Sequence, residues 1–354
     1  MFVAYFQRLC NADMARRKKL KRLPVKKIEN IAASVRCGLK ASLWLIALIP
    51  AMDAYSQVPQ HPPKINLAIE AYAFLRGQNS ALEKVSRQFP GLQDDVQALR
   101  QNADAVFGRS ERNIEQYLRK ELGDAAFLSL RTHIDSLAQV QLHEPIAEEK
   151  YAADFIEETK GRMRLGRGSS VPKGVLPFAY HDAPHQEMAD GHTARFSTQG
   201  HPKADHDIVA ISIPKSWRAE EAQMSQTIQQ FTSFHGNGLE KVLLAAYELP
   251  KEDSLMLTEK SAAEMIAPHS RLIRTEKVKI DGRQAIMAEI EETLNFRNAE
   301  MKIRMLQFMF IHNRKLYCLQ GSIGPVAMHY DLDLHLKKYE PFFRLVAAGT
   351  DIAD

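Results

Sequence analysis

The histidines of this 354-residue chain are concentrated in one short stretch. Five of the 13 histidines lie between residues 181 and 206, namely His181, His185, His192, His201 and His206. Carboxylates are interspersed among them, at Asp182, Glu187, Asp190, Asp205 and Asp207. Imidazole nitrogen and carboxylate oxygen together suit zinc, copper or nickel, and a loop can gather three or four such ligands. The five histidines are therefore our candidate metal ligands, with Zn or Cu as the candidate metal.

Two other interpretations of this histidine-rich stretch remain open. His181 and His185 would share one face only if the chain were helical there, and Pro184 and Gly191 favour an irregular path. The spacings match no established metal motif, so a solvated polar loop is the simpler interpretation. Clustered imidazoles could also sense pH, because they gain charge at about pH 6.

The rest of the chain contains no established catalytic or cofactor motif. There is no H-E-x-x-H, G-x-S-x-G or C-x-x-C sequence, no Walker loop and no dinucleotide-binding glycine pattern. The glycine-rich stretch 161–177 lacks the Walker spacing, and Pro172 removes a backbone N–H that a phosphate cradle needs. Catalytic groups can meet in space without a sequence motif, so a hydrolase with a dispersed active site stays an alternative. We favour a role without enzymatic activity.

Cysteine is rare in this chain, with residues Cys10, Cys37 and Cys318. After removal of an N-terminal signal, Cys318 alone would remain and could form no intramolecular disulfide. We expect Cys318 to be a small buried residue of a strand, because no activating base for a thiolate is identifiable.

A basic segment precedes a short apolar run at the N-terminus. The first 40 residues hold eleven Lys and Arg against two acids, whereas the whole chain carries a formal charge of +4, so the remainder is acidic. The apolar run 41–51 follows, and Ala54-Tyr55-Ser56 supplies small residues for cleavage after Ser56. This order is typical of a secretory signal peptide. We predict a signal peptide over residues 1–56 and a periplasmic or secreted protein.

The alternative to cleavage is an inner-membrane anchor formed by residues 39–52. Contact with the membrane would then occur only through this N-terminal segment, although the run is short for a span, which needs about 20 apolar residues. A basic arm that binds nucleic acid would leave the apolar run without a role, so we expect no nucleic-acid partner. A start at Met14 would shorten the basic segment.

Between residues 62 and 160 the apolar residues recur at the spacing of amphipathic helices. A first apolar stripe is expected to end at Gly77, and Ser110 and Asp124 are expected to cap the starts of later helices. Four to six antiparallel helices with short loops would form a small bundle. Residues 161–204 are expected to be a linker followed by the histidine-rich loop, because glycine and proline are frequent there.

From residue 205 to 350 the apolar spacing changes to the alternation of β-strands. Strands are expected over 207–213, 241–249, 271–280, 283–294, 301–311 and 315–323. Asp281-Gly282 between two alternating segments is a strong hairpin signal, and a second hairpin is expected at residues 312–315. Helices are expected over 220–234, over 261–266 and around Tyr339, with Pro341 favouring a start or a kink nearby.

This order predicts an α+β protein, with an N-terminal helical bundle followed by an antiparallel β-sheet flanked by helices. Three landmarks in the second half are Ile213-Pro-Lys-Ser-Trp217, Ile280-Asp-Gly-Arg-Gln-Ala285 and Lys315-Leu-Tyr-Cys-Leu319. With these landmarks, residues 205–348 resemble the PsbP-like α/β/α sandwich, which small exported bacterial proteins of the DcrB type share. Trp217 is expected at the edge of the core. The resemblance implies a non-catalytic binding or accessory domain outside the cytoplasm, and it supplies no catalytic residue.

The sequence therefore favours an exported protein that binds an envelope protein without catalysing a reaction. Metal binding through residues 181–206 and hydrolysis at a dispersed site are the two alternatives.

Overall fold

The computed structural model describes residues 64–163, 171–204, 206–222, 224, 226–249, 256–266, 270–296 and 299–353. The predicted signal peptide, residues 1–56, and the alternative anchor, residues 39–52, lie outside the described residues. Within the described ranges, no helix is long and apolar enough to cross a membrane.

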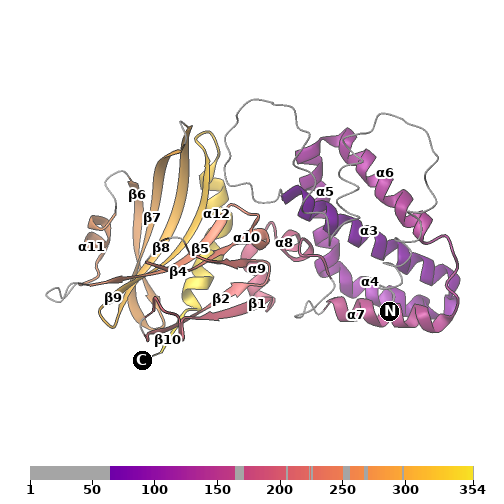
Figure 1. The fold of residues 1–354 in the computed structure, drawn as a ribbon, viewed down its shortest axis with the longest axis horizontal. Helices are drawn as coiled ribbons and strands as arrows, with labels where there is room; N and C mark the ends of the chain where they lie inside the picture. Colours follow the sequence, from indigo (N-terminus) through magenta and orange to yellow (C-terminus); the bar gives the residue numbers. More distant parts are fainter. Residues whose placement is uncertain are drawn as a thin grey trace. The chain divides into compact units, whose positions relative to one another are not determined.

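The contacts within the chain divide it into two compact units. The described part of the first, here called the helical unit, lies within Tyr72–Asp104 and Tyr117–Val171. The second, here called the sandwich unit, comprises Pro59–Ala71, Ala105–Gln116 and Pro172–Asp354. The expected fold class is confirmed, because helices occupy the first part of the chain and antiparallel sheets with flanking helices the second (Figure 1).

The helices of the first part are α3 (Lys64–Gln88), α4 (Gln93–Ala103), α5 (Arg109–Leu122), α6 (Asp124–Gln141) and α7 (Glu149–Met163). A 3₁₀ turn (Pro90–Leu92) separates α3 from α4, and a π-helical turn (Asp104–Gly108) leads into α5. The core of the helical unit joins apolar side chains of α3, α4 and α7, among them Leu82, Leu99 and Ile156.

Three expected helix ends differ from the structure. The prediction that Gly77 ends a helix is wrong, because α3 continues through Gly77 to Gln88. Ser110 is not a cap but lies inside α5, where its hydroxyl donates to the Val175 carbonyl oxygen at 2.8 Å. Asp124 is the first residue of α6, directly after the capping residue Gly123, whose φ of 81° suits glycine.

Among the described residues, the sandwich unit contains helices α8 to α12 and ten strands. The helices are α8 (Val175–Ala179), α9 (Pro184–Ala189), α10 (Ser233–Gly236), α11 (Glu259–Glu264) and α12 (Leu332–Ala348). The strands are β1 (Thr193–Ser197), β2 (Ile208–Pro214), β3 (Arg218–Glu220), β4 (Thr227–Thr232), β5 (Glu240–Glu248), β6 (Ser270–Ile280), β7 (Arg283–Phe296), β8 (Ala299–His312), β9 (Lys315–Ala327) and β10 (Asp351–Ala353). Helices α8 and α9 and strand β1 occupy much of the stretch expected to be a linker and loop.

These strands form two antiparallel sheets. One has the order β1-β2-β10 and the other the order β3-β4-β5-β9-β8-β7-β6. The two expected hairpins are confirmed, since Asp281-Gly282 joins β6 to β7 and Asn313-Arg314 joins β8 to β9. All four turn residues have positive φ, as a tight turn that matches the twist of the strands requires.

Alternation along the strands gives the larger sheet two buried faces. One face packs on α12 and on the smaller sheet, with Leu244, Phe308 and Phe343 in its core. The opposite face packs on α11, with Ile286 and Met309 in its core. Helix α12 runs through Pro341 without ending there.

The expected helix over 220–234 is wrong, because β3 ends at Glu220 and strand β4 lies in the middle of this stretch. Ile228 and Phe231 are three residues apart, a spacing typical of one helix face, and both enter the main core. A register shift between Thr227 and Gln229 makes Ile228 an extra, bulged residue. The bulge reverses the alternation, so two strand residues three apart face the same side.

Two single-residue predictions are confirmed. Cys318 is a free, buried residue of β9, and burial raises the pKa of its thiol to about 12. Trp217 is buried in the main core, where its ring lies 4.8 Å from the ring of Phe342.

We predict that Gly321→Ala destabilises the protein. A Cβ at Gly321 would stand 2.3 Å from ring carbons of Phe343, so α12 would have to shift on β9. The free energy of unfolding should fall by about 1–3 kcal/mol in urea denaturation. Gly77→Ala is the matched control, because nothing lies within 4 Å of that Cβ, and it should be neutral or slightly stabilising. Unchanged stability of Gly321→Ala would contradict this packing of α12.

Candidate functional site

A strained turn follows β4 and positions Ser233. The next two residues, Phe234 and His235, have φ angles of 49° and 51°, in the left-handed region that residues other than glycine seldom adopt. Gly238 allows the turn to close, because a Cβ there would stand 1.7 Å from the Ser233 hydroxyl. Strain of this kind persists only where surrounding contacts hold it, and it concentrates at functional sites.

Those contacts converge on Glu240, the first residue of β5. The Ser233 hydroxyl donates to Glu240 Oε2, and His335 Nε2 lies 2.7 Å from Oε1. Burial and the neighbouring Glu240 charge raise the pKa of Tyr339. Burial by itself would raise the pKa of Glu240. The hydrogen bond and charge of His335, together with Lys64 and the Ser233 bond, instead lower this pKa to about 2. Glu240 is therefore a buried anion at neutral pH.

Helix α12, which carries His335 and Tyr339, is held on the larger sheet by ion pairs. Buried Arg304 of β8 lies 2.6 Å from Glu289 Oε1 and 2.6 Å from Asp333 Oδ1 at the start of α12. Arg274 of β6 lies 2.8 Å from Glu340 Oε1 in the middle of the helix. Because these arginines join sheet and helix at two levels, the position of His335 and Tyr339 over Glu240 is fixed.

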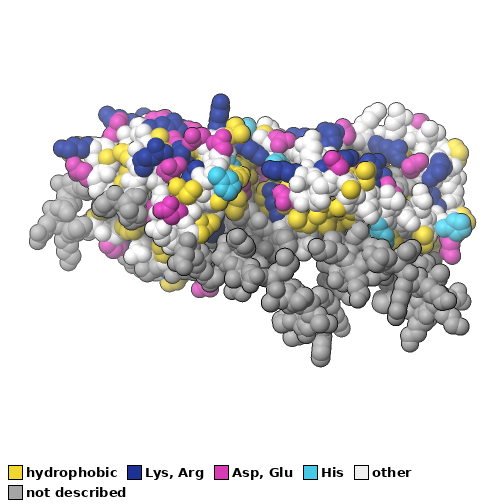
Figure 2. Space-filling view, turned by 90° about the horizontal axis from the view of Figure 1, so that it is seen from above, with side chains coloured by type: hydrophobic (Ala, Val, Ile, Leu, Met, Phe, Trp, Pro, Cys, Tyr) yellow, Lys and Arg dark blue, Asp and Glu magenta, His cyan; other side chains and the backbone are white. Residues whose placement is uncertain are grey.

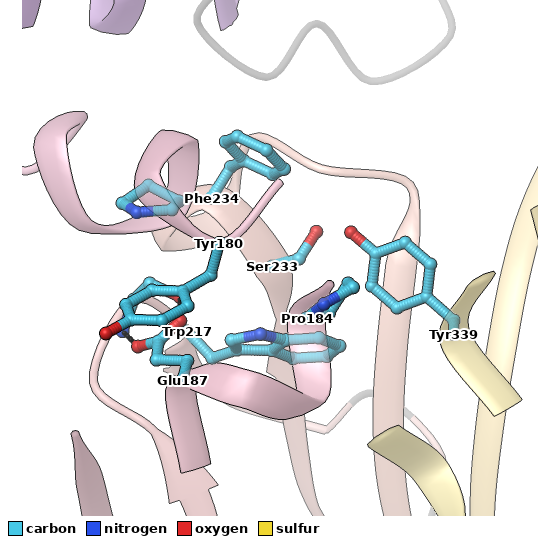
Figure 3. A pocket seen from close by; sticks show the side chains of 9 residues that line it. Tyr180, Pro184, Glu187, Trp217, Ser233, Phe234 and Tyr339 are labelled. Carbon is cyan, nitrogen blue, oxygen red and sulfur yellow. Dashed lines mark hydrogen bonds between the residues drawn. The ribbon is translucent and has the colours of Figure 1, made fainter. Parts of the chain in front are cut away.

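A small recess adjoins this cluster within the sandwich unit (Figure 3). Its volume is about 10 Å³, which is room for about one water molecule. Four lining residues are aromatic, namely Tyr180, Trp217, Phe234 and Tyr339. The polar lining comes from Glu187, Ser216 and Ser233 as well as the tyrosines. In Figure 3 the hydroxyls of Ser233 and Tyr339 point toward one another across the recess.

Glu187 of α9 is the carboxylic acid that lines the recess. It is buried and accepts hydrogen bonds from the Ser216 backbone N–H at 2.9 Å and the Ser216 hydroxyl at 2.5 Å. Burial raises the pKa of Glu187 to about 7, although the Ser216 bonds and the charge of Lys215 act in the opposite direction. Near neutral pH this carboxyl therefore changes between acid and anion.

The Ser233, Glu240 and His335 side chains do not have the order of a hydrolytic triad. In a triad the imidazole lies between the hydroxyl and the carboxylate and takes the hydroxyl proton. Here the carboxylate lies between the other two groups, and a carboxylate with a pKa of about 2 is a very weak base. This arrangement holds the turn to α12 rather than activating Ser233.

The structure places the first two predicted metal ligands on separate parts of the fold. His181 follows α8, with its Nδ1 3.0 Å from Asp182 Oδ1 and 3.3 Å from Lys338 Nζ. Burial, with Lys338 and Lys64, lowers the pKa of His181 to about 4. His185 lies in α9, and its buried Nδ1 has no hydrogen-bond partner among the described residues.

The remaining predicted ligands precede β1 or lie in the turn before β2. The ring of His192 lies 5.8 Å from that of Tyr180, and burial and Lys215 lower the pKa of His192. His201 Nδ1 accepts a hydrogen bond from the Lys203 backbone N–H at 3.3 Å, and His206 is exposed. Within the part of the chain that the structure describes, no three His, Cys, Asp or Glu side chains are grouped to hold a metal ion. Binding of Zn or Cu stays a prediction.

Sequence reasoning missed the residues that form the recess. Glu187 counted only as a carboxylate near histidines. Ser233 fell at the end of an expected helix, and Glu240 fell just before the expected strand 241–249. One local signal was present, because Gly236 and Gly238 lie between Ser233 and Glu240 in a stretch that follows a strand. Glu187, Glu240 and His335 are far apart in the sequence, so no local pattern indicates that they belong to one region of the fold.

Comparisons with known proteins find only a partial likeness. No family model matches the chain, and no curated protein matches its sequence. LpqN, involved in cell envelope biogenesis of Mycobacterium tuberculosis, is similar with a TM-score of 0.30 and 9% identity, over 49% of this chain and 98% of LpqN. PA94 of Pseudomonas aeruginosa, a protein of unknown function, is similar with a TM-score of 0.23 and 12% identity, over 45% of this chain and 95% of PA94. The likeness to both structures is weak and concerns about half of the chain.

We predict that Glu187 makes stability fall as pH rises from about 4.5 to 7. Its pKa is raised on folding, so the folded state holds a proton that the unfolded state loses in this window. Glu187→Gln keeps the shape of the protonated acid but cannot ionise. Between about pH 4.5 and 7, its free energy of unfolding in urea should therefore fall by about 3 kcal/mol less than that of the wild type. Glu264→Gln on α11 is the control and should follow the wild type. Parallel profiles for wild type and Glu187→Gln would refute the assignment.

Glu240 should show the opposite dependence. Because its pKa is lowered on folding, its contribution is complete above about pH 4.5 and is lost as pH falls toward 2. Glu240→Gln should cost about 3 kcal/mol at pH 7, measured by urea denaturation, and progressively less between pH 4.5 and 3. A cost that is the same at pH 7 and pH 3 would show that the charge of Glu240 is not responsible.

Proposed function

We propose that this protein is an exported, non-catalytic binding or accessory protein that acts through protein–protein interaction in the cell envelope. The proposal includes the PsbP-like architecture and the signal peptide expected from the sequence. The order of β2, β5, the β6–β9 meander and α12 supports the architecture. The observation that carries the binding role is an exposed apolar patch on the sandwich unit.

This patch lies at the end of the sandwich unit where α12 begins. It consists of Leu239, Met328, Tyr330 and Leu334, whose exposed fractions range from 39% to 68%. The Leu239 carbonyl oxygen accepts a hydrogen bond from the Gly324 N–H at 3.1 Å, which joins the start of β5 to the end of β9. Figure 2 looks onto this end and shows hydrophobic side chains among charged ones. Exposed apolar groups gathered in this way are typical of interaction sites.

The patch rests on the buried Glu240 cluster. The Tyr330 hydroxyl lies 3.0 Å from His335 Nδ1, and the Nε2 of the same ring bonds Glu240. Because Glu240 is an anion and can only accept, His335 carries its hydrogen on Nε2 toward the carboxylate. Tyr330 is thereby held in one position, and a surface ordered before binding loses less entropy when a partner binds.

Charges beside the patch indicate the chemistry of the partner. Asp331 caps α12 by accepting from the backbone N–H groups of Asp333 and Leu334 at 3.0 and 3.1 Å, and both aspartates are exposed. The complementary partner is a protein surface with apolar side chains next to Lys or Arg. The acidic border disfavours an anionic lipid surface as the occupant.

Photo-crosslinking tests this function in the cells that make the protein. A photoreactive residue at Leu334 should capture a discrete protein partner, whereas the same residue at Lys260 on α11 should not, because α11 packs on the opposite sheet face. With the captured protein purified, Leu334→Asp should weaken binding about tenfold or more, because a charge replaces an apolar contact.

The control for this measurement is Lys260→Asp, which should bind the partner as the wild type does. Equal crosslinking from both positions, or unchanged affinity of Leu334→Asp, would overturn the proposed binding surface.

A further inference from the structure

Three of the four hydroxyl groups that line the recess donate their hydrogens to carboxylates of the protein. Tyr180 donates its hydrogen to Asp190 Oδ2 at 2.7 Å, and Ser216 donates to Glu187 at 2.5 Å. Ser233 directs its hydrogen to Glu240, whose charge also acts on the Tyr339 hydroxyl. Since each hydroxyl has a single hydrogen, Tyr180, Ser216 and Ser233 offer lone pairs and no hydrogens to a ligand in the recess.

Carboxylates accept the hydrogen bonds of these hydroxyls and bring negative charge close to the recess. Glu187 is the charged residue of the lining, and its two oxygens have lone pairs beyond those that Ser216 uses. Asp190 and Glu240 lie one hydrogen bond further out. The basic residues near these three carboxylates do not line the recess, namely Lys215 near Glu187, Arg109 at 3.8 Å from Asp190, and His335, Lys64 and Lys338 near Glu240.

The aromatic lining adds a second attraction for a cation. The face of an aromatic ring carries partial negative charge and binds ammonium groups. Phe234 already contacts one ammonium group in this way, since the Lys64 nitrogen lies 3.5 Å from its ring centroid. Tyr180 likewise has the Arg109 guanidinium 4.9 Å from its ring. Trp217 and Tyr339 complete the aromatic lining of the recess.

We propose that this recess binds an ammonium group, the charged head of a small primary amine. An ammonium donates hydrogens and accepts none, which matches the lone pairs of Ser233, Tyr339 and Glu187. Its size is close to that of one water molecule, which suits a volume of about 10 Å³. An anion would face carboxylates, and a quaternary ammonium would be too large.

The proposal is independent of the protein-binding patch, and the two can fail separately. Leu334→Asp should leave amine binding unchanged, because Leu334 does not line the recess. Glu187→Gln should abolish amine binding and leave the Leu334 crosslink in place. Binding should also weaken about fivefold from pH 7 to 6 and about tenfold from pH 6 to 5, because the ionised fraction of Glu187 falls by these factors.

The test is an NMR titration of the full chain that follows the Trp217 indole signal, with Trp44→Phe used to assign it. Ammonium and methylammonium chloride should give saturable shifts that sodium chloride and tetramethylammonium chloride do not give. The shifts should vanish in Glu187→Gln and persist in Glu264→Gln. Tyr339→Phe, which removes one acceptor, should weaken binding without removing it.

Two sources can supply the ammonium group, and a further titration distinguishes them. Binding of Nα-acetyl-lysine amide as well as methylammonium would support a protein lysine as the source. Binding of methylammonium alone would support a free amine. Absence of a saturable shift with either ion, equal shifts with sodium chloride, or full binding by Glu187→Gln would overturn the proposal and leave the recess as a site for water.

Discussion

The Glu240 carboxylate joins the parts of the sandwich unit that form its site. It lies at the start of β5 and accepts hydrogen bonds from the strained turn through Ser233 and from α12 through His335. A buried anion is costly unless its lone pairs are satisfied, so the turn and the helix must stay where these donors reach it. The recess on one side and the patch beside Tyr330 on the other both depend on this arrangement.

The hydrogen bonds to the buried carboxylates also determine which donors and acceptors of the recess are available to a ligand. The hydroxyls of Tyr180, Ser216 and Ser233 direct their hydrogens to Asp190, Glu187 and Glu240 in turn. At Glu187 burial outweighs the Ser216 hydrogen bonds and the charge of Lys215, so its pKa rises, whereas at Glu240 the partners outweigh burial and the pKa falls. Two carboxyl groups of one unit thus have opposite pKa shifts because the balance between burial and partners differs.

The sequence predicted the fold class and the β6–β9 meander well, since these depend on local patterns. Asp281-Gly282 and the alternation on either side predict a hairpin without reference to distant residues. The helix expected over 220–234 was wrong because the bulge at Ile228 gives a strand the spacing of a helix. A bulge depends on pairing with β5, which no window of sequence contains.

By itself, the sequence determined the order of helices and strands, the burial of Cys318 and Trp217, and the concentration of histidine at 181–206. It also gives the acidic balance of the chain after its basic N-terminal segment. Only the tertiary structure decided that Glu187, Ser233 and Tyr339 line one recess and that Glu240 lies behind it. The physical reason is that hydrogen-bond direction and desolvation depend on atoms brought together from distant parts of the chain. The same residues, read in sequence, carry no sign of which hydrogens are already in use.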